Sequence, residues 1–201
     1  MNTVEVSNTE TLPEEEYYID EVEPDMAFRL YADNVLAVDV WVNETLSLTE
    51  GVRNRLLAEC PDRVRMETDT QGVLSRFFVK WEEVDNFDCS TSGDRHYCVD
   101  RLNNRLIFGD GVHVQIPRNT VDAAFLVQIT RCGGAEGNLE PDQINASMSR
   151  LLFIQDIRNP MKSYGGSDME TTEEALHRGG NLISSRHRLV SSTDYEREVL
   201  G

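Results

Sequence analysis

The sequence predicts an α+β protein: an antiparallel β sandwich or barrel-like domain, followed by a smaller segment of mixed strand and helix. Three observations predict this class. Short runs rich in β-branched and aromatic residues occupy positions 34–131, with turn formers between them. A glycine-rich turn, CGGAEGN, interrupts that pattern at Cys132. Two Thr-x-x-Glu patterns, which are typical of helix starts, then follow at Thr171 and Thr193.

The first 25 residues are predicted to be a flexible acidic lead-in. Seven acidic residues lie from Glu14 to Asp25, and two prolines in the lead-in lack backbone donors. Because like charges repel, this composition favours a solvated tail. An alternative stays open, in which residues 17–19 (YYI) dock as a short edge strand.

The first strong strand signal is NVLAVDVWVN, at residues 34–43. Its period of two is typical of a half-buried strand. The alternation separates two faces, with Leu36, Val38, Val40 and Val42 on one and Ala37, Asp39 and Trp41 on the other.

A short helix is predicted over residues 48–59. The pattern Ser47-x-x-Glu50 resembles a capping box, in which two side chains satisfy backbone donors at a helix start. Val52, Leu56 and Leu57 then form an apolar stripe.

From there to residue 131 the sequence predicts strands, namely VRMET, VLSRFFVKWEEV, HYCVD, RLIF, VHVQI and VDAAFLVQITR. In FFVKW the alternation places Phe77, Val79 and Trp81 opposite Phe78, Lys80 and Glu82. Two successive hairpins are expected, because each junction holds residues that adopt positive φ. Their turn residues are Asn103 and Asn104 in the first, and Gly109, Asp110 and Gly111 in the second.

Composition limits the classes of partner. The chain has 201 residues, of which 39% are apolar, so it can bury an ordinary core. Lys and Arg number 19 against 36 Asp and Glu, giving a net charge of −17, which argues against nucleic acid and anionic membranes. Neither an apolar run of about 18 residues nor a signal-peptide pattern is present. We therefore expect a cytoplasmically made chain with protein partners.

Candidate chemistry is sparse in the sequence. Four cysteines occur without a CxxC or Cys/His cluster, which favours reduced thiols over zinc or disulfides. Asp94 and His96 lack an accompanying nucleophile motif, and the glycine-rich turns lack the lysine of a phosphate loop. The acidic stretch GGSDMETTEE lacks the ligand order of a calcium loop. The sequence thus predicts no catalytic residue, no metal and no cofactor.

The stretch NPMKSYGGSD is predicted to be a hinge. An Asn-Pro pair ends an extended segment, a glycine pair turns the chain, and acidic residues then lie at a helix start, where the dipole favours them. The proposed hinge residues are Asn159, Pro160, Gly165 and Gly166.

Three regions follow from these patterns: the lead-in at 1–25, a mainly antiparallel β domain at 26–135, and a mixed segment at 136–201. Within the last, PDQINASMSRLLFIQDI is ambiguous between helix and strand. Thr171-x-x-Glu174 and Thr193-x-x-Glu196 each open a helix. The second of these is cut off after about two turns, so we expect this chain to be part of a longer protein.

Seven pieces occur in one order along residues 70–199: FFVKWEEVDNF, GDRHYCVD, NRLIFGDGVHVQIPRNT, CGGAEGN, IRNP, YGGSDMETTEEA and RHRLVSSTDYE. In this order they resemble the baseplate J-like proteins, which are baseplate assembly proteins of contractile phage tails and phage-like injection systems. RLVSST at residues 188–193 differs from the RAVT of many members.

The resemblance implies a structural wedge component that acts by protein-protein assembly around the central hub. Its partners would be other wedge, hub, sheath-proximal and fibre proteins, and copies of itself or a paralogue in a ring. It would be made in the bacterial cytoplasm and assembled into a virion or injection particle. The family has no catalytic residues to carry over.

Two rival functions have their own signatures. A carbohydrate-binding β module of a tail fibre requires Trp41 and Trp81 to be exposed and coplanar on one sheet face. A hydrolase requires a cleft that gathers Asp85, Asp88, Asp94 and His96, with a carboxylate of raised pKa.

Overall fold

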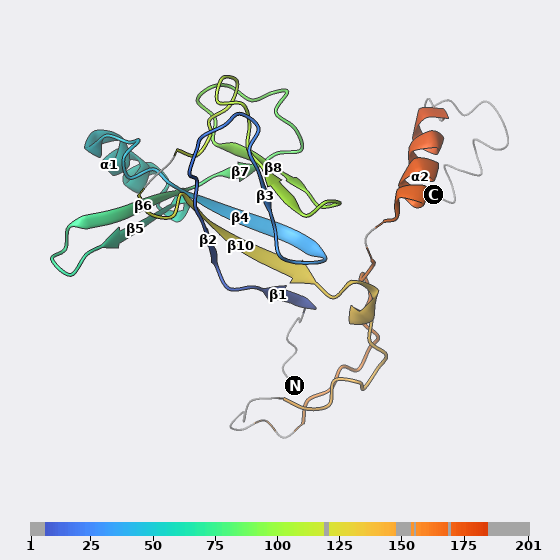
Figure 1. The fold of residues 1–201 in the computed structure, drawn as a ribbon. Coiled ribbons are helices and arrows are strands. Elements are labelled where there is room, and N and C mark those ends of the chain that lie inside the picture. Colours follow the sequence, from blue (N-terminus) through green and yellow to red (C-terminus); the bar gives the residue numbers. More distant parts are fainter. Residues whose placement is uncertain (1–6, 119–120, 148–153, 155, 169, 185–201) are drawn as a thin grey trace.

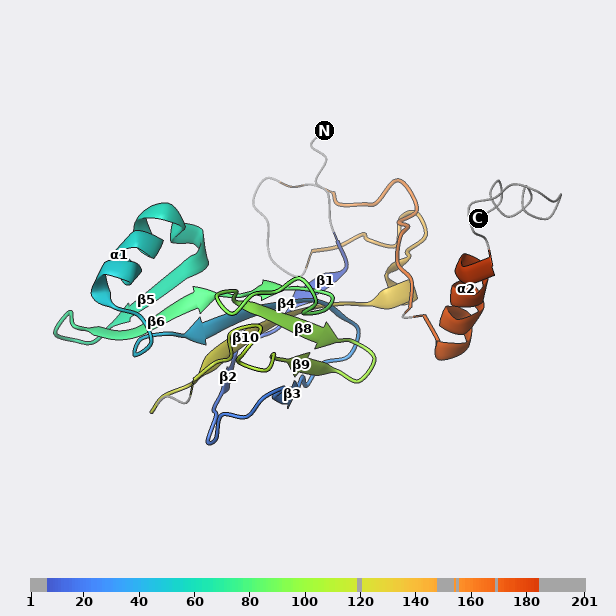
Figure 2. The same ribbon diagram turned by 90° about the horizontal axis from the view of Figure 1, so that it is seen from above.

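The computed structural model describes residues 7–118, 121–147, 154, 156–168 and 170–184. Two β-sheets face each other, and an arm of chain that ends in a helix extends away from them (Figures 1 and 2). The larger sheet is antiparallel and curls into a half-barrel. The predicted α+β class with a barrel-like β domain is confirmed.

The larger sheet has the strand order β1-β10-β4-β6-β5, and β2 lies beside β1 along the same edge of β10. Its strands are β1 (Thr9–Thr11), β2 (Glu15–Tyr17), β4 (Val35–Asn43), β5 (Val64–Thr68), β6 (Leu74–Lys80) and β10 (Phe125–Cys132).

The smaller sheet has the order β3-β9-β8-β7, and its β7–β8 pair is parallel. Its strands are β3 (Ala27–Arg29), β7 (Glu82–Glu83), β8 (His96–Asp100) and β9 (Arg105–Ile107). The first predicted hairpin joins β8 to β9, with Asn104 at φ 51° in its turn. The helices are α1 (Glu50–Glu59) and α2 (Thr172–Ser184), with short 3-10 turns η1 (Pro61–Arg63) and η2 (Gly134–Gly137).

The main core lies between the two sheets. Alternate residues of the two central strands are buried there, namely Val38, Val40, Val42, Phe125, Val127 and Ile129. Tyr97, Leu106 and Phe108 pack against them from the smaller sheet. Burying each such side chain contributes roughly 1.5–3 kcal/mol, so the alternating residues of these two strands are a substantial part of the stability of this core.

A second cluster covers the opposite face of the larger sheet. It holds Trp41, Phe78, Ala123 and Leu126. The Arg65 guanidinium lies 3.8 Å from the centroid of a Trp41 ring. Phe78 and Trp81 belong to clusters on opposite faces, as the alternation in FFVKW predicts. Both residues are nonetheless buried, because both faces of the sheet are covered.

The prediction of a flexible lead-in is wrong for residues 9–11 and 15–17, which form β1 and β2 along β10. Ile19 is buried, and the Tyr17 ring stacks on Phe125 with centroids 5.0 Å apart. The acidic side chains of this region pair across the sheet, as Glu16 does with Arg76 at 3.1 Å. These ion pairs and apolar contacts offset the repulsion that the composition suggested.

The placement of Leu36 on the buried face is also wrong, because its side chain is 51% exposed. The ladder between β4 and β10 shifts at this point: Ala37 pairs with Thr130, whereas Val35 pairs with Arg131. Such a bulge opposes two residues to one and reverses the alternation. Val35 is therefore buried in place of Leu36.

The second predicted hairpin does not form, since VHVQI is not a strand. Gly111 has the expected positive φ of 74°, but the Asp110 carboxylate accepts hydrogen bonds from the backbone N–H of Val112 and His113. The loop then packs back on itself and buries Val114. Local side-chain bonding of this kind competes with strand pairing.

The two capping predictions have opposite outcomes. The helix expected at 48–59 forms as α1, and no residue of α1 is buried. The predicted Ser47–Glu50 capping box is wrong, because α1 begins at Glu50. Its N-cap residue is Thr49, which makes no side-chain cap. The Thr171–Glu174 box is confirmed, because the Glu174 carboxylate accepts from the Thr171 N–H at 2.8 Å and Thr171 Oγ1 accepts from the Glu174 N–H at 3.3 Å. The Thr193–Glu196 pattern lies outside the described residues.

Acid should destabilise the loops of the smaller sheet. The side chain of Asn103 lowers the pKa of Asp100, and the backbone N–H of His113 lowers the pKa of Asp110. Because the folded pKa values lie below the unfolded ones, this stabilisation is full above about pH 4 and is lost as the pH falls through the folded values. We therefore expect the urea concentration at the unfolding midpoint to decrease when the pH is lowered below about 4. Asp100→Ala should make the urea midpoint depend less on pH in this range, whereas substitution of the exposed Glu21 by Ala should not. If both variants show the same dependence on pH as the wild type, the Asp100 carboxylate is not a source of the acid sensitivity.

Candidate functional site

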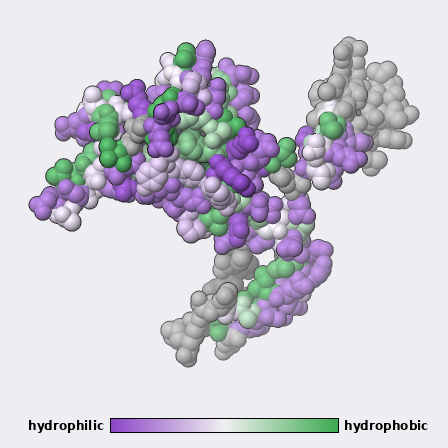
Figure 3. All heavy atoms as spheres, viewed as in Figure 1, coloured by the Kyte–Doolittle hydropathy of each residue, from purple (hydrophilic) through white to green (hydrophobic). Residues whose placement is uncertain are grey.

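The arm comprises residues 134–184, after the end of β10. None of its described side chains between 135 and 179 is buried. Large apolar side chains lie on its surface, as Figure 3 shows. Those that are more than half exposed are Ile154, Met161, Tyr164 and Leu176. The described part of the arm between residues 135 and 179 therefore presents apolar surface and contains no buried side chain.

The predicted hinge residue Asn159 fastens the arm to itself. Its Oδ1 accepts from the backbone N–H of Ile144 at 2.8 Å, and its Nδ2 donates to the carbonyl of Glu140 at 2.9 Å. The next residue, Pro160, is exposed. Sequence spacing found Asn159 but not these partners, because the contacts join stretches about 15 residues apart.

The glycine pair lies where the arm returns to its starting point. Gly165 has a φ of 95°, and Gly166 exchanges two hydrogen bonds with the Asn138 side chain, at 2.7 and 3.0 Å. A Cβ at Gly166 would approach the Gly134 carbonyl oxygen too closely for any ordinary contact. Glycine is thus required at 165 by conformation and at 166 by space. Rotation about this segment stays a prediction.

Replacing Gly166 with Val should loosen the arm without unfolding the β body. The new side chain must displace Gly134 or Asn138 and break their hydrogen bonds. We expect faster limited proteolysis within residues 134–168, with the thermal midpoint of the body nearly unchanged. Gly165→Val should act similarly through backbone strain of about 1–3 kcal/mol. Unfolding of the body in either variant would place this segment within the core.

Helix α2 begins with its own electrostatic support. Besides the Thr171–Glu174 box, the Arg178 guanidinium pairs with Glu170 at 2.9 Å and lowers the pKa of that carboxyl. Leu176 is 73% exposed. The N-terminal end of α2 is therefore stabilised by side-chain interactions, while the apolar side chain of Leu176 lies exposed on the helix.

A buried acid, which the sequence analysis did not identify, links the two sheets. Glu44 is only 4% exposed and receives hydrogen bonds from Arg95 Nε at 2.7 Å and Arg95 Nη2 at 2.8 Å. Trp81 Nε1 donates to the same carboxylate at 2.9 Å. The Glu44 carboxylate raises the pKa of Arg95. This bidentate pair holds the β7–β8 region against β4.

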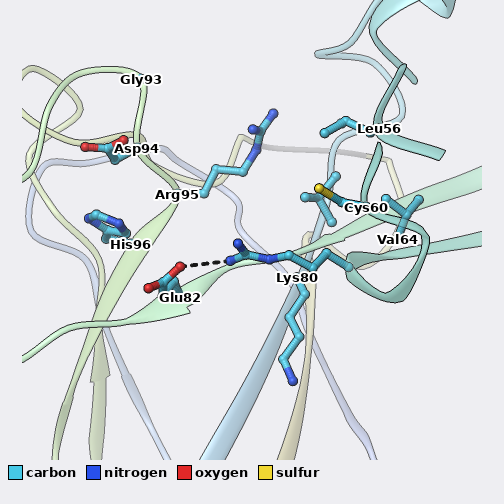
Figure 4. Close-up of a pocket in the computed structure, with 11 residues that line it drawn as sticks. Leu56, Cys60, Val64, Lys80, Glu82, Gly93, Asp94, Arg95 and His96 are labelled. Atoms are coloured by element: carbon cyan, nitrogen blue, oxygen red, sulfur yellow. Dashed lines mark hydrogen bonds and ion pairs between the residues drawn. The ribbon is translucent and has the colours of Figure 1, made fainter. Parts of the chain in front are cut away.

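A cleft of about 210 Å³ lies next to this pair, between α1 with its following turn and the loop before β8 (Figure 4). Its apolar wall contains Leu56, Cys60, Val64 and Val79. Its polar lining residues are Arg63, Lys80, Glu82, Asp94, Arg95 and His96. Arg63 and Glu82 form an exposed ion pair across it at 3.1 Å.

The cleft lacks the arrangement expected of a hydrolase. Asp94 and His96 line it, but Asp85 and Asp88 do not. Hydrogen bonds from Thr91 lower the pKa of Asp94 rather than raising it. His96 Nδ1 lies 2.9 Å from Ser90 Oγ, and Ser90 is not among the lining residues.

The other rival signature is absent as well. Trp41 and Trp81 are 6% and 2% exposed and belong to clusters on opposite faces of the larger sheet. They cannot form an exposed coplanar platform for a sugar. In the described part of the chain, no group of three or more His, Cys, Asp or Glu side chains could hold a metal ion. No described helix is long and apolar enough to span a membrane.

Comparisons with known proteins give no match: no family model fits the chain, and neither a curated protein nor a solved structure resembles it significantly.

Proposed function

We propose that this chain is a structural component of the baseplate wedge of a contractile injection apparatus, either a phage tail or a phage-like particle. It acts by binding neighbouring baseplate proteins around a central hub. The ordered series of motifs along residues 70–199 supports the family. The observation that carries an assembly role is the arm, whose described side chains between 135 and 179 include none that is buried.

An assembly role explains features that a compact enzyme would not require. Exposed apolar side chains on a fixed backbone gain stability when a partner covers them. The arm backbone is held by the side chains of Asn138, Asn159 and Ser163. It therefore presents Met161 and Tyr164 in a defined geometry, which lowers the entropy cost of binding.

Deletion of the gene in the source bacterium tests this proposal. We expect tubes and sheaths without complete baseplates in electron micrographs, and restoration by the intact gene. The Gly166→Val protein should restore particles less well than the wild type, because its arm is displaced. Normal particles after deletion would contradict a structural role in the baseplate.

A further inference from the structure

We propose that helix α2 of one copy docks into the cleft beside α1 of a second copy, so that successive copies join head to tail. This inference rests on the proposed assembly function and identifies the surfaces that would carry out part of it. The occupant of the cleft would be the first two turns of α2, with Leu176 against the apolar wall.

The shape of the chain favours a second copy over closure within one chain. In Figures 1 and 2, α1 and α2 lie on opposite sides of the β body. The arm would have to cross the body to reach its own cleft, and its internal hydrogen bonds fold it back on itself rather than extending it. A contact between two different surfaces of identical subunits builds rings or filaments.

Apolar surface matches apolar surface in this pairing. Leu56, Cys60 and Val64 line one wall of the cleft, and no residue of α1 is buried. Leu176 on α2 is largely exposed. Both helices therefore have apolar side chains that remain uncovered in the single chain.

Charge also favours this partner. Residues 50–80, which comprise α1, β5 and β6, hold six Lys and Arg against five Asp and Glu, although the whole chain has a net charge of −17. Residues 168–174 hold four acidic residues and no basic one. Among the described residues, the exposed side chains of Arg55 and Glu173 each lack a hydrogen-bond or ion-pair partner. Opposite charges across an interface set its orientation.

A disulfide trap tests the docking with the full chain. Cys60 is exposed in the cleft, so Leu176→Cys should form an intermolecular disulfide with it if their Cα atoms come within about 4.4–6.8 Å. The background carries Cys89→Ser to remove another exposed thiol. We expect oxidised dimers and higher species whose yield rises with protein concentration and which Cys60→Ser abolishes.

Matched variants decide the outcome. Leu102→Cys, at a 63% exposed site in the β8–β9 turn, should give little cross-linking. Glu173→Arg should lower the yield from Leu176→Cys about threefold, and adding Arg55→Glu should restore it. Equal yields from both cysteine sites, a disulfide within one chain, or no disulfide would overturn the proposal.

The docking proposal and the proposed baseplate function fail in different ways. If the particles contain the protein but no intermolecular disulfide forms, only the docking proposal fails. If the disulfide forms but the particles never contain the protein, the proposed baseplate function fails.

Discussion

Glu44→Ala is expected to destabilise the protein by about 3–5 kcal/mol, because it leaves the Arg95 guanidinium partly buried without its carboxylate. It also removes the acceptor of the buried Trp81 N–H. Since whole domains are stable by about 5–15 kcal/mol, the loss should move the urea midpoint markedly. Equilibrium denaturation followed by tryptophan fluorescence measures it, with Trp81 as a reporter close to the change.

The exposed pair of Arg63 and Glu82 supplies the control. Both side chains are about half exposed, and such pairs contribute about 0–1 kcal/mol. Glu82→Ala should therefore change the midpoint little. If Glu44→Ala were as mild, the Glu44–Arg95 pair would not be a structural link between the sheets.

Tyr17→Ala is expected to cost about 3 kcal/mol, which would establish the N-terminal residues as part of the fold. Its ring stacks on Phe125 and meets Phe28 edge to face at 6.0 Å. Its hydroxyl also donates to the Arg29 carbonyl at 2.9 Å. Thermal and urea denaturation should both show the loss.

Tyr18→Ala is the matched control for this change. Tyr18 is 60% exposed, and its hydroxyl donates to Glu16 on the surface. Its removal should cost well under the amount expected for Tyr17, as is usual for surface sites. A loss from Tyr17→Ala as small as that from Tyr18→Ala would mean that the lead-in contributes no packing to the core.

The central strands could be predicted because their pattern is local. The alternation of Val38, Val40 and Val42, and the β-branched run that includes Ile129, identify two strands from the sequence alone. That the two strands pair with each other is shown only by the structure. β1 could not be found in this way, because it has three residues and pairs with a strand more than 100 residues later. For β2 the sequence offered only the alternative that residues 17–19 dock as a short edge strand, which holds for Tyr17. The bulge at Leu36 likewise depends on the partner strand.

The candidate site was predictable only in part. Asn-Pro and Gly-Gly pairs marked the returning segment of the arm, since their conformations are special in any sequence. Their partners, Asn138 and Gly134, are set by tertiary contacts. Glu44 had no sequence signal either, because a single acid after a strand is usually solvated, and only the approach of Arg95 allows its burial.

Mass spectrometry of intact contractile particles, purified by density gradient from the organism that encodes this chain, tests the assembly role most directly. We predict that peptides of this chain sediment with sheath, tube and spike proteins at a fixed ratio. They should remain after a high-salt wash that removes loosely bound protein. Absence of the chain from intact particles that retain their baseplates would contradict the proposed wedge role.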